Sequence, residues 1–273
     1  MTHPFDAAVA LDATAPDTFA ARTSPAYWNM VGPFGGITAA TVLRAVESHP
    51  ARLGEPLSLT VNYAAAVAEG PFTVQARPVR TNRSTQHWTV DILQPGPGGA
   101  PAVTTTATAV TAARRTTWSA SDMPVPEAPP PETVAQRDVF RGVAWIQRYA
   151  MRPLAGALPQ AWDGAESGDS LTRLWLRDEP PRPLDFAALT ALCDVFYPRV
   201  WLRRALMVPA GTVSLTVYFH AGSDALAAVG SGWLLAQARA QEFRNGFFDQ
   251  NAQLWNEAGR LLATSHQVVY YKE

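Results

Sequence analysis

The sequence predicts an α+β protein built from two tandem copies of one unit, a long helix followed by an antiparallel sheet. The first observation is a repeated tetrapeptide, SLTV, at Ser58–Val61 and again at Ser214–Val217. The second is a repeated tripeptide, QAR, which follows in the same order at Gln75–Arg77 and Gln237–Arg239. Both repeats fall inside matching hydrophobic patterns, which indicates an internal duplication.

Each half begins with a predicted helix. In the first half the helix is GGITAATVLRAVESH, residues 35–49, and in the second it is LDFAALTALCDVFY, residues 184–197. Asp185 is the expected N-cap of the second helix, because its side chain can accept a hydrogen bond from a free backbone N–H. The apolar residues of this helix share one face, and Asp194 is expected on the same helix, roughly 120° from the centre of that face.

Each helix is followed by four predicted strands. These runs are rich in β-branched residues and alternate in part between apolar and polar, which favours strands with one buried face. Turn signals, PGPGGAP and NEAGR, separate the last two runs of each half. By their place in the repeat, the strands correspond as residues 57–65 with 212–221, 72–81 with 233–242, 85–94 with 246–256, and 102–112 with 261–271.

The proline-rich segment SDMPVPEAPPPE separates the two halves. Proline favours an extended, semi-rigid chain, so this segment is expected to be a surface linker. The predicted organisation is an N-terminal repeat over residues 1–120, the linker over 121–132 and a C-terminal repeat over 133–273. The second sheet is expected to begin within residues 137–154, and the Pro-, Gly- and Asp-rich stretch after it is expected to form loops.

Composition excludes several classes of function. Of the 273 residues, 47% are hydrophobic and 16% are charged, which suits a globular protein with a sizeable core. The net charge of −1 gives no general attraction to nucleic acid or to an anionic membrane. A single cysteine, no evident signal peptide and no apolar span lead us to expect a cytoplasmic protein. The histidines and the cysteine show no metal-ligand spacing, so neither a metal nor another cofactor is expected.

Five motifs carry a resemblance to a known family. They are GPFGG at the start of the first helix, LTVNY, LDFAALTALCD, GTVSLTVYFH and GRLLATSHQ. Together with the duplicated unit, they make the chain similar to the double-hotdog acyl-CoA thioesterases, especially the thioesterase II group, from about residue 25 to residue 271. The resemblance implies a double hotdog, in which two helix-plus-sheet repeats form one continuous sheet around two central helices.

The resemblance also implies a site. In the thioesterase II pattern, an Asp on the second helix, a Thr at the start of the following strand and a Gln on the last strand hold the hydrolytic water. These roles fall on Asp194, Thr212 and Gln267. Asp194 would accept a proton from the water, and the other two side chains, each a donor and an acceptor, would orient it. One departure is Ser214, which stands where the family usually has an acidic residue.

Two glycines at the start of the first helix, Gly35 and Gly36, are candidates for binding substrate. Helix N-termini offer free backbone N–H groups to negative charge, and glycine allows a ligand to approach closely. The pair is therefore predicted to stabilise the oxyanion of the reacting thioester. The alternative is that both glycines only shape a turn.

The predicted function is hydrolysis of a fatty acyl-CoA, or of a related acyl thioester, to the free acid and CoA by direct attack of water. Two alternatives stay open. One is an enoyl-CoA hydratase on the same fold, which needs an Asp–His pair that the sequence does not show. The other is a non-catalytic acyl-CoA or fatty-acid binding protein. Ser214 leaves this alternative open, because it replaces an acidic residue that is usual in the family. The expected partners are the acyl-CoA substrate and further copies of the chain in a homo-oligomer, with no nucleic acid.

Several other residues invite functional interpretations that the pattern disfavours. Cys193 falls on the apolar helix face with no evident partner histidine, which favours a buried, inert thiol. GDSL at Gly168–Leu171 matches a serine-hydrolase motif by its letters, but it lies mid-chain with no D-x-x-H after it. The basic stretch 77–83 is expected to be a solvated strand end, with a contact to a CoA phosphate as the alternative. Structural or exposed roles are expected for His220 and His266. A hydrogen bond within its loop is expected for Asn29, with a contact to substrate as the alternative.

Overall fold

The computed structural model describes residues 2–136 and 142–273. In the described residues, the first half contributes six strands to one antiparallel sheet. They are β1 (Asp12–Ala15), β2 (Thr18–Arg22), β3 (Glu55–Tyr63), β4 (Pro71–Thr81), β5 (Thr85–Pro95) and β6 (Pro101–Ala112). The second half contributes β7 (Tyr149–Ala155), β8 (Thr172–Asp178), β9 (Ala210–Phe219), β10 (Leu234–Arg239), β11 (Phe243–Arg244), β12 (Phe247–Asn256) and β13 (Leu261–Tyr271).

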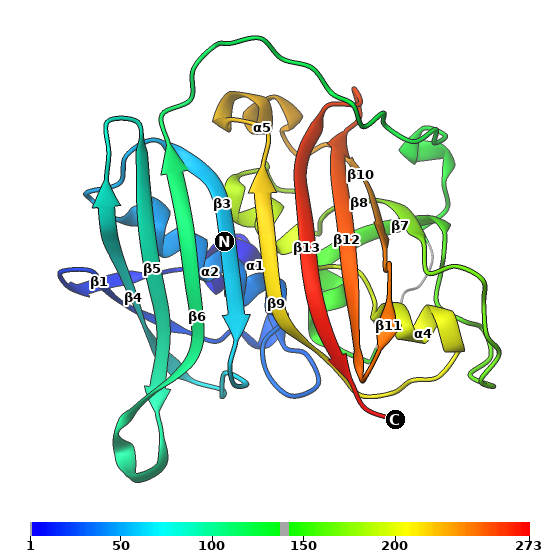
Figure 1. The fold of residues 1–273 in the computed structure, drawn as a ribbon, viewed down its shortest axis with the longest axis horizontal. Helices are drawn as coiled ribbons and strands as arrows, with labels where there is room; N and C mark the ends of the chain where they lie inside the picture. The colour runs from blue at the N-terminus through cyan, green and yellow to red at the C-terminus, as the bar shows by residue number, and fades with distance from the viewer. Residues whose placement is uncertain (1, 137–141) are drawn as a thin grey trace.

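All these strands form a single sheet in the order β1-β2-β4-β5-β6-β3-β9-β13-β12-β10-β8-β7, and β11 pairs with β12. The order on one side of the β3–β9 pair mirrors the order on the other side, as the strand correspondence in the sequence requires. Figure 1 shows the sheet as a continuous layer with α2 behind it. The predicted α+β fold, two helix-plus-sheet repeats joined in one sheet, is confirmed.

The two halves meet at the antiparallel pair β3–β9. Thr60 and Thr216 are the equivalent threonines of the two SLTV repeats, and they lie directly opposite each other. Their Oγ1 atoms are 3.0 Å apart, so a pseudo-twofold axis passes between them. Both halves also carry a β-bulge at the same place in the repeat, at Leu57 on β3 and at Val213 on β9. The duplication is thus visible in register as well as in sequence.

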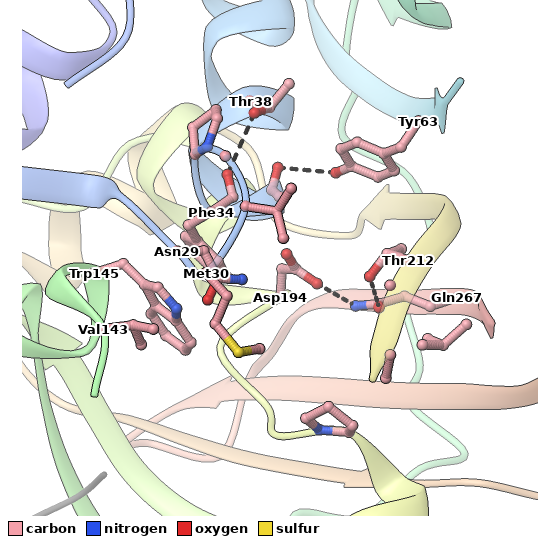
Figure 2. Close-up of a pocket in the computed structure, with 18 of the residues that line it drawn as sticks. Asn29, Met30, Phe34, Thr38, Tyr63, Val143, Trp145, Asp194, Thr212 and Gln267 are labelled. Carbon is pink, nitrogen blue, oxygen red and sulfur yellow. Dashed lines mark hydrogen bonds between the residues drawn. The ribbon is translucent and has the colours of Figure 1, made fainter. Parts of the chain in front are cut away.

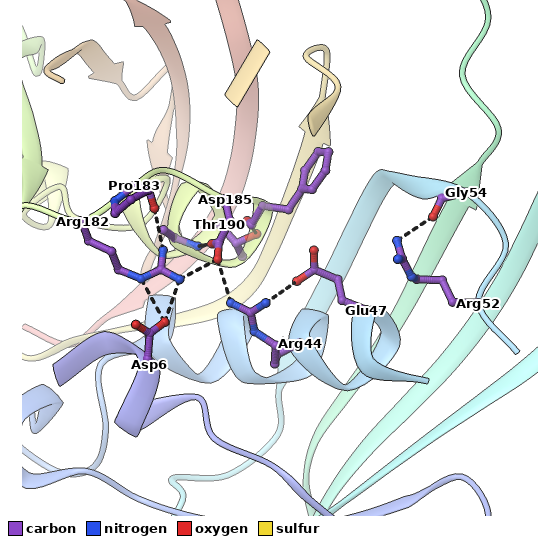
Figure 3. Close-up of polar contacts among 11 residues, drawn as sticks. Asp6, Arg44, Glu47, Arg52, Gly54, Arg182, Pro183, Asp185 and Thr190 are labelled. Atoms are coloured by element: carbon purple, nitrogen blue, oxygen red, sulfur yellow. Dashed lines mark hydrogen bonds and ion pairs between the residues drawn. The ribbon is translucent and has the colours of Figure 1, made fainter. Parts of the chain in front are cut away.

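Two helices lie inside the fold, α2 (Gly35–Ser48) and α3 (Phe186–Leu192), and they pack against each other. Most of α2 and all of α3 are buried, which explains why both are apolar on nearly all sides. Asp185 caps α3 as predicted and accepts from the Ala188 N–H at 2.8 Å. The same carboxylate binds Arg44 of α2 at 2.8 Å, so the start of α3 is tied to the second half of α2 (Figure 3).

Short helices complete the described structure: α1 (Pro4–Ala8), α4 (Arg199–Arg204), α5 (Ser223–Val229) and the 3-10 turns η1 (Pro25–Tyr27), η2 (Pro97–Gly99), η3 (Pro131–Thr133) and η4 (Ala144–Arg148). Residues 113–130, which include most of the proposed linker, contain no helix or strand and pass over one end of the sheet toward the second half (Figure 1). Among the described residues, no helix has the length and apolarity needed to cross a membrane.

The second half differs from expectation in more than one element. The stretch after residue 154 was expected to form loops, but it contains β8, which pairs with β7 and β10. The sheet of the second half begins with β7 at Tyr149, within the predicted range, of which residues 137–141 lie outside the described residues. The helix predicted over residues 184–197 is shorter, because α3 ends at Leu192. Its last turn tightens, since the N–H groups of Cys193 and Asp194 bond to carbonyls three residues back. Pro198 also disfavours a helical conformation in the residue before it.

Candidate active site

A cavity of about 400 Å³ opens between the two halves. The first half contributes the residues around the start of α2 and the end of β3, and the second contributes the segment after α3 and parts of β9, β12 and β13. Asp194 is the only charged side chain among the described residues that line it. Met30 and Val31, which are 56% and 78% exposed, lie at its mouth. Aromatic walls are formed by Phe34, Trp145, Phe196, Tyr197, Trp201 and Phe248.

Asp194 lies in the turn after α3, two residues beyond the end of the helix. The prediction that it lies on the helix is therefore wrong, although its predicted burial is right, because the residue is only 8% exposed. The turn directs its carboxylate at the start of α2, where the backbone N–H of Gly36 donates a hydrogen bond to it. The first half of the chain thus helps to hold an acid that belongs to the second half.

The structure brings Asp194, Thr212 and Gln267 together at this cavity (Figure 2). The Nε2 atom of Gln267 donates to Asp194 Oδ1 at 2.8 Å. The Thr212 hydroxyl donates to Gln267 Oε1 at the longer distance of 3.4 Å. Gln267 is 3% exposed, so its amide is fixed between an acid and a hydroxyl. The three side chains form one chain of hydrogen bonds along the cavity wall.

Burial sets the protonation of this site. It raises the pKa of Asp194 to about 7, and the hydrogen bonds from Gln267 and Gly36 act in the opposite direction. The carboxyl group can therefore exchange a proton near neutral pH. Burial, and then the neighbouring charge of Asp194, hold the pKa of Tyr63 well above its usual value. Tyr63 is thus a neutral hydrogen-bond donor beside the acid.

The paired glycines of α2 are required by close packing. A Cβ atom on Gly35 would come within 2.7 Å of Asp194 Oδ2, and one on Gly36 would come within 2.7 Å of the Ala191 carbonyl oxygen. The oxyanion role predicted for Gly36 stays a prediction, and the N–H of this residue interacts with the Asp194 carboxylate and lowers its pKa. Gly35 lines the cavity, and its contact with substrate stays a prediction.

Tyr63 and Gln250 are polar residues of the cavity that sequence reasoning did not predict. The Tyr63 hydroxyl donates to the Gly35 carbonyl oxygen at 2.9 Å and so holds the first turn of α2 (Figure 2). Gln250 lies on β12 directly opposite Gln267 of β13 and is 2% exposed. A signal for Gln250 exists in the repeat, because the equivalent position of the first half is Trp88. No such signal marks the direction of the Tyr63 hydroxyl.

A buried arginine fixes the cavity wall beyond Asp194. Arg199, at the start of α4, is fully buried. It donates from Nε to the Tyr197 carbonyl at 2.9 Å and from Nη1 to the Ser170 carbonyl at 3.0 Å. Burial lowers its pKa to about 9, so it remains charged at neutral pH. These bonds secure residues 196–198, which line the cavity.

Ser214, the departure from the family pattern, lies away from the cavity. On β9 the buried residues are Leu215, Val217 and Phe219, and Ser214 alternates with them toward the outer face of the sheet. It is not among the residues that line the cavity. The missing acid therefore leaves the contacts between Asp194, Thr212 and Gln267 intact.

Asn29 lines the cavity, whereas the other remaining candidates lie elsewhere. None of the histidines in the described residues lines the cavity. Cys193 is buried outside it, and burial raises the pKa of its thiol. Ser170 of the GDSL stretch is buried and accepts from the Ala240 N–H at 2.9 Å, which gives it a structural role. Arg77 pairs with Asp91 on the exposed part of the sheet at 3.1 Å. No described group of three or more His, Cys, Asp or Glu residues is placed to hold a metal ion.

Two family models match the chain. An acyl-CoA thioesterase N-terminal domain matches residues 24–116, and an acyl-CoA thioesterase C-terminal domain matches residues 121–271. The chain belongs to the acyl-CoA thioesterase family. The resemblance seen in the five motifs is thereby confirmed for this member of the family. No curated protein matches it.

Solved structures share the fold of this acyl-CoA thioesterase family member. A conserved hotdog-fold protein of unknown function from Alicyclobacillus acidocaldarius is 48% identical, with a TM-score of 0.92 over 100% of this chain and 99% of that one. A putative thioesterase II from Thermobifida fusca is 20% identical, with a TM-score of 0.81 over 98% and 97%. The tesB protein of Mycobacterium avium subspecies paratuberculosis is 18% identical, with a TM-score of 0.77 over 98% of both chains. The double-hotdog arrangement is therefore confirmed.

Proposed function

We propose that the protein hydrolyses fatty acyl-CoA, or a related acyl thioester, to the free acid and CoA by direct attack of water. The observation that carries the proposal is the chain of hydrogen bonds from Thr212 through Gln267 to Asp194, at the wall of a largely apolar cavity. The apolar wall suits an acyl chain, and the single buried carboxylate suits the activation of one water molecule. Membership of the acyl-CoA thioesterase family supports the same reaction.

In the proposed mechanism, Asp194 accepts a proton from water while the water oxygen attacks the thioester carbonyl carbon. Gln267 keeps the carboxylate oriented, and Thr212 orients the water together with it. The resulting tetrahedral intermediate collapses, the carbon–sulfur bond breaks, and the proton held by Asp194 passes to the leaving thiolate. The products are a carboxylic acid and a thiol, and no acyl-enzyme is formed.

The two alternative functions have less support. A hydratase that uses an Asp–His pair would need a histidine at the cavity, and no described histidine lines it. The binding-protein alternative depended on Ser214, which lies outside the cavity. A buried carboxylate with a pKa near 7 is also a poor neighbour for a purely apolar ligand, since its charged form costs free energy without a reaction to serve.

The experiment is a free-thiol release assay over acyl-CoAs of graded chain length. Wild type is expected to turn over at least part of the series, and Asp194→Asn is expected to lower kcat by about 10²- to 10⁴-fold, the usual contribution of a general base. Asp178→Asn is the matched control, because Asp178 is also buried with a pKa raised to about 7 but does not line the cavity. Hydrolysis that survives in Asp194→Asn would eliminate this base.

The pH dependence gives a second test. Because Asp194 must be ionised to accept a proton, kcat/KM should rise about tenfold per pH unit below about pH 7 and level off above it. The rise is measured by thiol release between pH 5 and pH 8.5 at fixed ionic strength. A profile that is flat across pH 7 would exclude Asp194 as the titrating base.

A further inference from the structure

The cavity holds one buried amide that the proposed mechanism does not use. Gln250 is 2% exposed, lines the cavity and lies directly opposite Gln267 in the β12–β13 pair. Directly opposed residues of an antiparallel pair present their side chains on the same face, with Cβ atoms about 4.5–5.5 Å apart. The Gln250 amide is therefore a near neighbour of the amide that holds Asp194.

Other buried glutamines of this chain are fully occupied. Gln86 accepts from the Leu53 N–H and donates to the Ala51 carbonyl and to the Thr81 hydroxyl. Gln94 likewise bonds to backbone groups of Ala68 and Pro71. The Gln250 amide has no hydrogen-bond partner among the described residues. The amide lines the cavity, so its N–H groups and its oxygen can bond to a ligand that occupies the cavity.

The reaction also needs donors for the carbonyl oxygen, and beside the predicted contact of Gly35 a second one can take part. Charge develops on the thioester carbonyl oxygen as water attacks, and a fixed N–H group is required to stabilise it. The Gly36 N–H predicted for this role interacts with the Asp194 carboxylate. Gln267 uses its Nε2 on the same carboxylate. Gln250 carries two N–H groups on the cavity wall and is free to serve.

We infer that Gln250 is a catalytic residue whose Nε2 donates a hydrogen bond to the thioester carbonyl oxygen and strengthens it as the oxyanion forms. This inference rests on the proposed function. It divides the labour between two neighbouring glutamines of β12 and β13. Gln267 orients the base on the water side of the carbonyl, and Gln250 holds the oxygen of the carbonyl itself.

The kinetic test uses Gln250→Leu, which keeps the side-chain size and removes the donor. Loss of one oxyanion donor lowers kcat by about 10²- to 10³-fold, and KM is expected to stay within about threefold. Gln253→Leu is the matched control, because Gln253 lies on the same strand but faces the other side of the sheet, where it accepts from Gln237 at 3.1 Å. Gln250→Met serves if the Leu variant does not fold. Unchanged kcat in a folded Gln250 variant would overturn the inference.

A binding test separates this inference from the proposed function. Two non-hydrolysable probes of equal chain length are compared by calorimetry, a ketone analogue in which CH₂ replaces the thioester sulfur, and an alkyl-CoA thioether that lacks the carbonyl. Wild type and Gln253→Leu should bind the ketone about tenfold more tightly, and Gln250→Leu should lose this preference. A preference that persists in Gln250→Leu contradicts the inference even if hydrolysis is observed. Absence of hydrolysis with a Gln250-dependent preference would contradict the proposed function alone, and binding of neither probe would contradict both.

Discussion

The two halves of the molecule share one sheet design but differ at an equivalent place inside it. In the second half, Gln250 and Gln267 face each other across β12–β13 and line the cavity. In the first half, the equivalent pair across β5–β6 is Trp88 and Ala109. Trp88 is 1% exposed, and its Nε1 donates to the Thr111 hydroxyl at 3.2 Å. One copy therefore places a large apolar ring where the other places two amides.

The C-terminal ends of α2 and α3 also differ, with a packed residue in the first half and a cavity-lining residue in the second. The turn after α3 carries Asp194, whose carboxylate faces the cavity. Directly after α2 comes His49, which is buried, lies with its ring centroid 5.0 Å from that of Trp88 and contacts Asp17 at 2.8 Å. At these two helix ends, His49 contacts Asp17, whereas Asp194 faces the cavity. A duplicated unit can thus keep its backbone while one copy uses the position for packing and the other for a site.

The largest effect expected from this comparison concerns stability. Trp88→Ala should lower the free energy of unfolding by about 3–5 kcal/mol, because it leaves a cavity in a packed core. The turnover of the folded protein should change little, since Trp88 does not line the active cavity. Urea unfolding and thiol release measure the two quantities. Trp118→Ala is the matched control, because Trp118 is 88% exposed and should contribute almost nothing to stability. A loss of kcat in stable Trp88→Ala would mean that the first half also takes part in catalysis.

The next effect concerns the free energy of unfolding that is lost because the Asp194 carboxyl group is buried in the second half. The folded-state pKa of Asp194 is raised to about 7, so between about pH 4 and pH 7 the folded state binds a proton that the unfolded state releases. Stability from this group is therefore lost as pH rises through that window, and Asp194→Asn should remove the loss. Relative to wild type, the variant should gain about 2–3 kcal/mol of unfolding free energy between pH 5 and pH 8.

This difference is measured by urea unfolding of both proteins at both pH values. The contributions of the other buried acids, Asp178 and Glu47, are common to the two proteins and cancel. A stability difference that stays constant from pH 5 to pH 8 would show that Asp194 does not titrate in this range.

The sequence was sufficient for the duplicated centre of the sheet because its patterns occur in both halves, whereas β1 and β2 were not predicted and β8 was expected to be a loop. SLTV, QAR and the strand patterns around them predicted which strands correspond, and the equivalence of Thr60 and Thr216 across β3–β9 agrees with that alignment. The family pattern also named three residues, Asp194, Thr212 and Gln267, that lie side by side in the structure.

The sequence could not show which way certain side chains face or which groups contact each other across the fold. Helical spacing continued α3 through Asp194, because the tightened last turn depends on tertiary contacts and leaves no periodic signal. The run Asp249–Asn251 is polar at every position, so alternation alone could not show that Gln250 faces inward. The interaction between the Gly36 N–H and Asp194 could not be predicted, because the two residues are distant in sequence.

The smallest predicted effect is that of a substitution at Tyr63 that makes the two halves identical at one equivalent position. Tyr63 of the first half corresponds to Phe219 of the second in the SLTV repeats, and each lies over the first residue of a helix. The Tyr63 hydroxyl bonds to Gly35 at 2.9 Å, whereas the Phe219 ring packs on Phe186 with centroids 5.4 Å apart. Tyr63→Phe therefore gives the first half the residue that the second half already has.

Removing this hydroxyl should cost about 1 kcal/mol, the net value of one hydrogen bond, and lower kcat/KM about fivefold, because the first turn of α2 positions Asp194 through Gly36. Thiol release and urea unfolding measure the change. Tyr218→Phe, at a half-exposed position next to Phe219, is the control and should alter neither quantity. If Tyr63→Phe behaved like this control, the hydroxyl would be incidental, and the two halves would differ in function only through Asp194 and the β9, β12 and β13 side chains that line the cavity with it.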